Sequence, residues 1–176
     1  TGSGKSTLIN LIPRFYDVTE GSIRIDGIDV RKFNLKALRK KIGFIRQKNL
    51  LFTGTIKSNI KFGKPHATHD EVEHSAKIAQ AYDFITNKEK GFDEPISEGG
   101  SNVSGGQKQR LSIARALVRK PEIYIFDDSF SALDYKTDSV LRKELKKYCK
   151  INFENVWLFR VKNIPLHSQM KIVMHS

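Results

Sequence analysis

Hydrophobic and polar positions along this chain follow the two periods that mark strands and helices. The segment GSIRIDG at 21–27 alternates isoleucine with polar residues between glycines, which predicts a short strand in a hairpin-rich region. The segment IGFIR at 42–46 predicts a second short strand. The segment EIYIFDD at 122–128 contains a run of apolar residues that ends in two carboxylates, and it predicts a buried strand.

Helical patterns fill the intervals between these strands. The first helix follows a glycine-rich start and should end at Pro13 or just before it. Asn34 is the predicted N-cap of a helix with the sequence LKALRKK. Further helices are predicted at about 70–87, from position 104 to the stretch before Pro121, and at about 136–149. Strands that alternate with helices predict an α/β domain with a largely parallel sheet.

Composition places the chain among globular proteins. It has 176 residues, of which 39% are hydrophobic and 28% charged, and no apolar run approaches the roughly 20 residues of a membrane-spanning helix. The single cysteine, Cys149, excludes a disulfide within the chain. The net charge of +12 allows nucleic acid or an anionic membrane as a partner. Because the basic residues are scattered and lack interleaved aromatic residues, we interpret them as solvated and expect no nucleic-acid partner.

The first residues match the end of a phosphate-binding loop. GSGKST at 2–7 is the tail of the pattern G-x-x-x-x-G-K-[ST], whose glycines let backbone N–H groups converge on phosphate oxygens at a helix N-terminus. In this pattern Lys5 reaches the β- and γ-phosphates and the Ser6 hydroxyl coordinates Mg²⁺. An ordinary Gly/Ser turn is the alternative. The predicted phosphate-binding residues are Gly2, Ser3, Gly4, Lys5, Ser6 and Thr7.

The adjacent carboxylates Asp127 and Asp128 predict a metal at the end of the buried strand. Like charges repel, so a fold should avoid this pair unless a cation or ligand offsets the cost. In phosphate-loop NTPases an apolar strand ends in an aspartate that helps to hold Mg²⁺, and Asp127 fits that position. Aspartate is also common in turns, but the phosphate loop favours the metal site.

A third motif narrows the class. SNVSGGQKQRLSIARAL at 101–117 resembles the signature motif of the ATP-binding cassette (ABC) family. A serine hydroxyl and two glycine N–H groups at the start of a helix form a second anion site. The motif stands between the phosphate loop and the strand that ends in Asp127, in the family's order. The predicted signature residues are Ser104, Gly105, Gly106 and Gln107.

The remaining family motifs are also recognisable. Gln47 follows a strand, as the glutamine of the family's Q-loop does, where it touches Mg²⁺ and the attacking water. LFTGTIKSNI at 51–60, and Glu98 in the loop before the signature, resemble the exporter subgroup. SALD resembles the D-loop, which crosses the dimer interface in this family. Its residues are Ser131, Ala132, Leu133 and Asp134.

This resemblance, over about residues 1–148, implies a phosphate-loop NTPase core with a helical subdomain at about 62–110. It implies Mg²⁺ as cofactor and ATP as substrate, with two such domains in a head-to-tail dimer. Each ATP then lies between one chain's phosphate loop and the other chain's SGGQ. Transmembrane domains are the further partner, which places the chain at the cytoplasmic face of the plasma membrane.

Three departures from the family pattern change these expectations. The family's adenine-stacking aromatic residue and membrane helices precede the phosphate loop, so we expect a chain truncated at its N-terminus. Asp128 stands where the family has a glutamate as general base, and it is one methylene shorter. A displacement of 1 Å costs about a hundredfold in rate. Phe159 and Arg160 stand near the family's switch histidine, so we expect 150–176 to be a degenerate, frame-changed or truncated end.

Three functions follow from these motifs. The first is the ATPase subunit of an export-type ABC transporter, with a slow site of its own and a signature motif that completes a partner's site. The second is a nucleotide-binding module without turnover, regulatory or non-functional, which Asp128 and the missing histidine favour. The third is an ABC ATPase that acts on DNA. The absence of a sustained heptad between Thr7 and Ser104 argues against the third.

Overall fold

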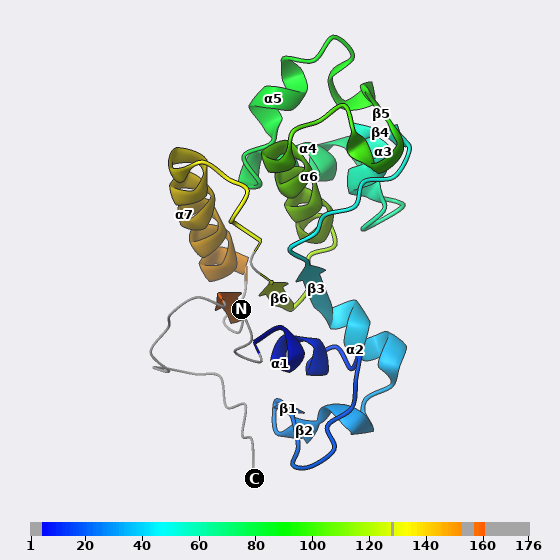
Figure 1. Cartoon of the computed structure of the whole chain (residues 1–176), viewed down its shortest axis with the longest axis vertical. Coiled ribbons are helices and arrows are strands. Elements are labelled where there is room, and N and C mark those ends of the chain that lie inside the picture. The colour runs from blue at the N-terminus through cyan, green and yellow to red at the C-terminus, as the bar shows by residue number, and fades with distance from the viewer. Residues whose placement is uncertain (1–4, 128, 153–156, 161–176) are drawn as a thin grey trace.

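A parallel sheet lies at the centre of the computed structural model (Figure 1). The structure describes residues 5–127, 129–152 and 157–160. Within them, β6 (Ile123–Phe126) lies between β3 (Ile42–Ile45) and β7 (Trp157–Arg160) and pairs in parallel with both. The predicted parallel sheet is therefore confirmed. The C-terminal segment expected to be degenerate supplies the edge strand β7.

The remaining strands form two short antiparallel ribbons, and seven helices surround the sheet within the described residues. The ribbons are β1 (Arg24–Ile25) with β2 (Ile28–Asp29), and β4 (Gly54–Thr55) with β5 (Pro95–Ile96). The helices are α1 (Lys5–Leu11), α2 (Leu35–Lys41), α3 (Ile56–Lys61), α4 (His69–Ile78), α5 (Tyr82–Thr86), α6 (Gly105–Leu117) and α7 (Tyr135–Asn152). Single 3₁₀ turns lie at Val30–Lys32, Gly91–Asp93 and Glu98–Gly100.

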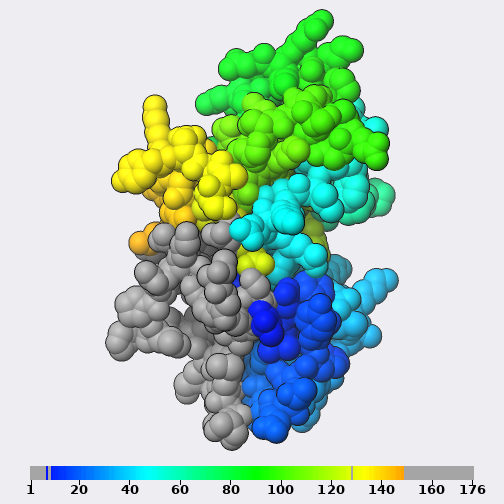
Figure 2. Space-filling model, in the orientation of Figure 1, coloured from blue at the N-terminus to red at the C-terminus, as the bar shows by residue number. Residues whose placement is uncertain are grey.

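Strand β6 separates two hydrophobic clusters. Its side chains alternate between faces, so Ile123 and Ile125 join a cluster with Ile9 of α1. Tyr124 and Phe126 join the other cluster, which includes residues of α3, α4, α6 and α7. All four side chains are buried, as a strand covered on both faces requires. In Figure 2 the residues of α3 to α6 lie in the upper part of the molecule. Those of α1, α2 and the β1–β2 ribbon lie in the lower part.

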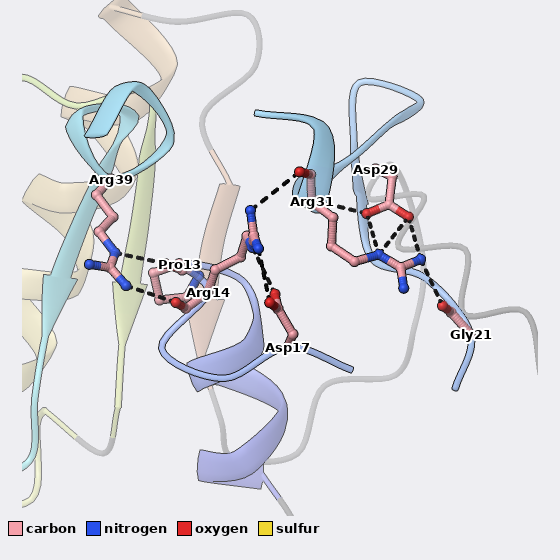
Figure 3. A network of polar contacts seen from close by, with 7 residues as sticks. All are labelled: Pro13, Arg14, Asp17, Gly21, Asp29, Arg31 and Arg39. Carbon is pink, nitrogen blue, oxygen red and sulfur yellow. Dashed lines mark hydrogen bonds and ion pairs between the residues drawn. The ribbon is translucent and has the colours of Figure 1, made fainter. Parts of the chain in front are cut away.

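Polar contacts join α1, the β1–β2 ribbon and α2 (Figure 3). Arg14 pairs with Asp17 at 2.7 Å, directly after α1 ends before Pro13. Arg31 pairs with Asp29 at 2.7 Å, and it donates to the carbonyl of Gly21. In α2, Arg39 donates to the carbonyls of Pro13 and Arg14. These contacts hold the turn after α1, which lies at the opposite end of the helix from the predicted phosphate loop.

The helical region differs from its prediction in two places. The pattern at about 70–87 forms two helices, α4 and α5, because Gln80 adopts a left-handed conformation with φ of 56° that ends α4. The short helix α3 was not predicted. It begins at the N-cap Thr55, whose side chain accepts a hydrogen bond from Ser58 N. The division of the chain that assigns 62–110 to a helical subdomain stays a prediction.

Helix α4 is anchored at its first turn by a carboxylate. Glu71 closes a capping box with Thr68 and accepts hydrogen bonds from Lys64 at 2.7 Å and from Lys120 at 3.0 Å. The bond from Lys64 contributes most to a lowered pKa, and Lys120 and the Thr68 N–H add to it. Together they bring the pKa of Glu71 from 4.5 to about 2. Lys120 follows α6, so this carboxylate ties the start of α4 to the end of α6.

These contacts predict a loss of stability in acid. A carboxyl whose pKa falls on folding stabilises the folded state above its unfolded pKa, and that contribution is lost as pH falls towards the folded pKa. The free energy of unfolding should therefore decline between pH 4.5 and about 2. Glu71→Gln should flatten part of this decline, measured by urea unfolding at pH 7, 4 and 2.5. An identical pH dependence in the variant would contradict the role of Glu71.

Candidate functional site

Two predicted site residues lie at the same end of the parallel sheet. The register pairs Ile45 with Phe126, so Gln47 and Asp127 both follow the carboxyl ends of neighbouring strands. The carbonyl oxygen of Ile45 accepts from Asp127 N at 2.9 Å and from the buried Ser129 hydroxyl at 2.8 Å. These bonds fix the turn after β6 against the end of β3. Gln47 is exposed and Asp127 half-buried, so both are within reach of a ligand.

Helix α1 packs on one face of this sheet. Its buried Ile9 shares a cluster with Ile123 and Ile125 of β6. The backbone of Lys5 and Ser6 opens the helix, as the phosphate-loop pattern predicts, and Thr7 is exposed. Four of the residues predicted for this site lie outside the described residues, namely Gly2, Ser3, Gly4 and Asp128.

The signature residues open α6. Ser104 is the N-cap, with its hydroxyl accepting from Gln107 N at 3.2 Å, while the Gln107 side chain accepts from Ser104 N at 3.1 Å. This capping box holds both side chains at the helix N-terminus. Ser104 and Gly105 are exposed, and a Cβ added to Gly105 would meet nothing within 4 Å. The N-terminus of α6 is therefore open to an anion from outside the chain.

The predicted D-loop contacts the signature motif. A Cβ added to Gly106 would lie 3.1 Å from the carbonyl oxygen of Ala132, so a glycine allows this close approach. Ser131 and Asp134 are exposed, and Leu133 is half-buried. The Asp134 carboxylate accepts from Thr137 N at 2.9 Å at the start of α7, and this bond lowers the pKa of Asp134. The two motifs therefore form one exposed surface.

Sequence reasoning did not identify the network behind the Q-loop. Arg115 of α6 donates from Nε to the Asn59 carbonyl at 2.8 Å, from Nη2 to Asn59 Oδ1 at 2.9 Å, and from Nη1 to the Leu50 carbonyl at 2.9 Å. Its guanidinium also lies over the rings of Phe52 and Phe62. The sequence signals were Phe52 and Asn59 within the exporter-like stretch LFTGTIKSNI, and Arg115 within the signature stretch at 101–117. This network fixes α3 and the end of the Q-loop on α6.

We expect Arg115→Ala to be strongly destabilising. It removes three hydrogen bonds from a charged group, each worth about 1.5–3 kcal/mol, partly replaced by water, so we expect a net loss of about 2–4 kcal/mol. Arg115→Lys keeps the charge but not the planar set of donors, and should recover less than half of the loss. Urea unfolding of the three proteins measures this. A loss below about 0.5 kcal/mol, typical of surface substitutions, would contradict the structural role.

A groove lies in front of this network. Its volume is about 540 Å³, and aromatic and basic side chains line it. Phe15 and Phe44 meet edge to face at 5.4 Å, and Arg46 lies over Phe15 at 5.2 Å. Phe52 and Phe62 are large apolar residues that stay exposed. This groove adjoins the Q-loop and offers apolar contact area to a partner segment.

The side-chain oxygen atoms at the end of the sheet are suitable ligands for Mg²⁺. Mg²⁺ prefers oxygen ligands and usually binds through one or two protein groups together with substrate phosphates. Asp127 offers a half-buried carboxylate at the end of β6, and the exposed Gln47 follows the neighbouring strand β3. Among the described residues no group of three or more His, Cys, Asp or Glu side chains could hold a metal ion by itself. Asp127 and Gln47 offer oxygen ligands of the kind that Mg²⁺ uses together with substrate phosphates.

Comparison with known proteins agrees with this geometry. The sequence model of the family "ABC transporter" matches residues 1–131. Curated proteins from Staphylococcus aureus strains NCTC 8325 and bovine RF122, named as multidrug export ATP-binding/permease proteins, are 52% identical over 176 residues, which is 100% of this chain and 30% of theirs. A solved bacterial Atm1-family ABC exporter with ATP bound superposes with a TM-score of 0.85 and 39% identity, over 90% of this chain and 27% of that one.

The chain therefore belongs to the ABC transporter family, and its fold is that family's phosphate-loop NTPase fold. Within the family it is of the ATPase type. It spans about a third of the length of the curated relatives that it matches. Among the described residues no helix is both long and apolar enough to cross a bilayer.

Proposed function

We propose that this chain is the ATP-binding and ATP-hydrolysing domain of an export-type ABC transporter. The observation that carries the proposal is the arrangement at the end of the sheet. Gln47 and Asp127 follow neighbouring parallel strands, and the helix that continues the phosphate-loop pattern packs on β6. The match to the ABC transporter family over residues 1–131 and the exporter relatives support the same function.

In this proposal the chain's own residues hold and orient ATP. Backbone N–H groups of the phosphate loop and the Lys5 ammonium bind the β- and γ-phosphates. Ser6, Gln47 and Asp127 would hold Mg²⁺, which when bound would offset phosphate charge. A water positioned by Gln47 forms a bond to the γ-phosphorus as the bond to the β–γ bridging oxygen breaks. Asp128 accepts the proton of that water, and ADP and phosphate leave.

The signature motif acts on a second ATP, bound by a partner domain. Ser104 and Gly105 are exposed at an open helix N-terminus, and the D-loop lies against Gly106. We propose a heterodimer in which this surface completes the partner's site, while the shorter Asp128 leaves this chain's own site slow. The described residues of β7 have the sequence WLFR, without a histidine at the end of the strand, which supports the slow own site.

The groove beside the Q-loop is the proposed contact with the transmembrane domains. Exposed Phe52 and Phe62 and the neighbouring Phe15 offer apolar area, and Arg46 offers a donor. A segment from the membrane domain that fills this groove would be displaced when the loop that carries Gln47 moves. In the assembled exporter the chain would then lie at the cytoplasmic face of the plasma membrane.

A nucleotide-binding module without turnover is the second candidate. Asp128 in place of glutamate favours it. The two functions separate when ATP hydrolysis and ATP binding are measured on the same sample of the isolated chain, where no partner site contributes phosphate. We expect binding together with hydrolysis. Binding with no release of phosphate would support the regulatory module instead, and absence of both would contradict the ATP site itself.

A further inference from the structure

A side-chain contact joins the Q-loop to the signature helix. Asn49 Nδ2 donates to Gln109 Oε1 of α6 at 2.7 Å, and it makes a longer contact of 3.4 Å with the carbonyl oxygen of Gln47. The Asn49 amide therefore bridges α6 and the backbone of the residue that the proposed function places beside the metal. Because the bridge reaches the Gln47 backbone, it constrains the direction in which that side chain leaves the loop.

Gln109 is a costly residue at its position. Its exposed fraction is 1%, and its Nε2 has no hydrogen-bond partner among the residues that the structure describes. An unpaired buried amide costs about 1–3 kcal/mol, whereas a methionine of similar length would fill the same space without that cost. Packing alone therefore does not explain a glutamine here. The hydrogen bond that Oε1 accepts from Asn49 is the contact that a glutamine provides here and a methionine would not.

We propose that Gln109 is a positioning residue for Gln47 and acts through Asn49. This inference rests on the proposed function, in which Gln47 contacts the Mg²⁺ bound with ATP. Gln109 also lies five positions after Ser104 on the same helix. The contact therefore ties the loop that senses this chain's own nucleotide to the helix that presents the signature motif to the partner.

The test replaces Gln109 by methionine in the full chain. Gln109→Met removes the bond to Asn49 together with the unpaired amide, so the thermal midpoint should stay unchanged or rise. Affinity for Mg-ATP should fall about fivefold, while affinity for ATP in EDTA should not change. Backbone amides of residues 47–49 should exchange hydrogen faster, in the absence of nucleotide, because the loop has lost its anchor.

Two further variants isolate the bond. Asn49→Ala should reproduce both effects, and the double variant should add nothing, because both changes remove one interaction. Ser112→Ala is the control, since Ser112 Oγ is another buried polar atom of α6 without a partner among the described residues. It should alter neither Mg-ATP affinity nor exchange at 47–49.

The outcomes separate this inference from the proposed function. A lower midpoint in Gln109→Met with unchanged Mg-ATP affinity and exchange would show a structural role only, and would overturn the inference. So would additive effects of the two substitutions. If the unmodified chain binds ATP equally well with and without Mg²⁺, the proposed metal site fails. The exchange measurement needs no nucleotide, so faster exchange at 47–49 would then still support the anchoring of the loop.

Discussion

Replacing Ser104 by alanine is expected to lower the ATPase rate of the assembled transporter by about a hundredfold. Loss of one preorganised donor to the charge that develops in a transition state costs about 10²–10³ in rate. Ser104 is exposed at the N-terminus of α6, and in the proposed arrangement its hydroxyl contacts the ATP bound by the partner domain. Asp128→Ala should change the same rate little, because the slow site contributes little turnover. Removing the partner's glutamate should nearly abolish the rate.

A matched control removes the effect of capping from this comparison. Ser104 caps α6, so its loss also costs about 1 kcal/mol of stability. Thr68 caps α4 through the same kind of capping box, and Thr68→Ala should cost similar stability without any loss of ATPase activity. If Asp128→Ala alone abolishes turnover, the shorter carboxylate is an effective base and the asymmetric heterodimer is wrong.

Elements with strong local signals were predictable from the sequence. Asn34 accepts from Ala37 N and caps α2 as its residue type predicts, and α1 ends before Pro13. The apolar run before Asp127 is buried at every position of β6. These features depend on chemistry within a few residues of each other. The register places Gln47 and Asp127 at one end of the sheet, because parallel strands bring their carboxyl ends together.

Features that depend on tertiary contacts were not predictable. The end of α4 at Gln80 has no glycine or proline to announce it, and the Gln80 carbonyl accepts from Arg110 of α6 at 2.8 Å. The pair Asn49 and Gln109 is separated by 60 positions, so no local pattern could reveal it. Helix α3 is short, with six residues, and its helical period is too brief to recognise.

The segment after α7 shows how a poor motif match can still fold. Residues 157–160 were interpreted as part of a degenerate end because no histidine follows an apolar strand there. The structure pairs them with β6, with Phe126 opposite Arg160, and apolar character alone is sufficient for an edge strand. The alignment with the Staphylococcus aureus relatives also runs over all 176 residues.

The most direct measurement of the central claim is the affinity of the chain for a labelled ATP analogue, with and without the Lys5 ammonium. Lys5 begins α1, where the phosphate-loop pattern places a lysine against the β- and γ-phosphates. Lys5→Ala should weaken binding more than tenfold, or by at least about 1.4 kcal/mol. The control Lys36→Ala removes an exposed lysine near the start of another short helix, α2, and should leave the affinity unchanged. Equal affinities for the unmodified chain and Lys5→Ala would contradict the phosphate-loop assignment and the function built on it.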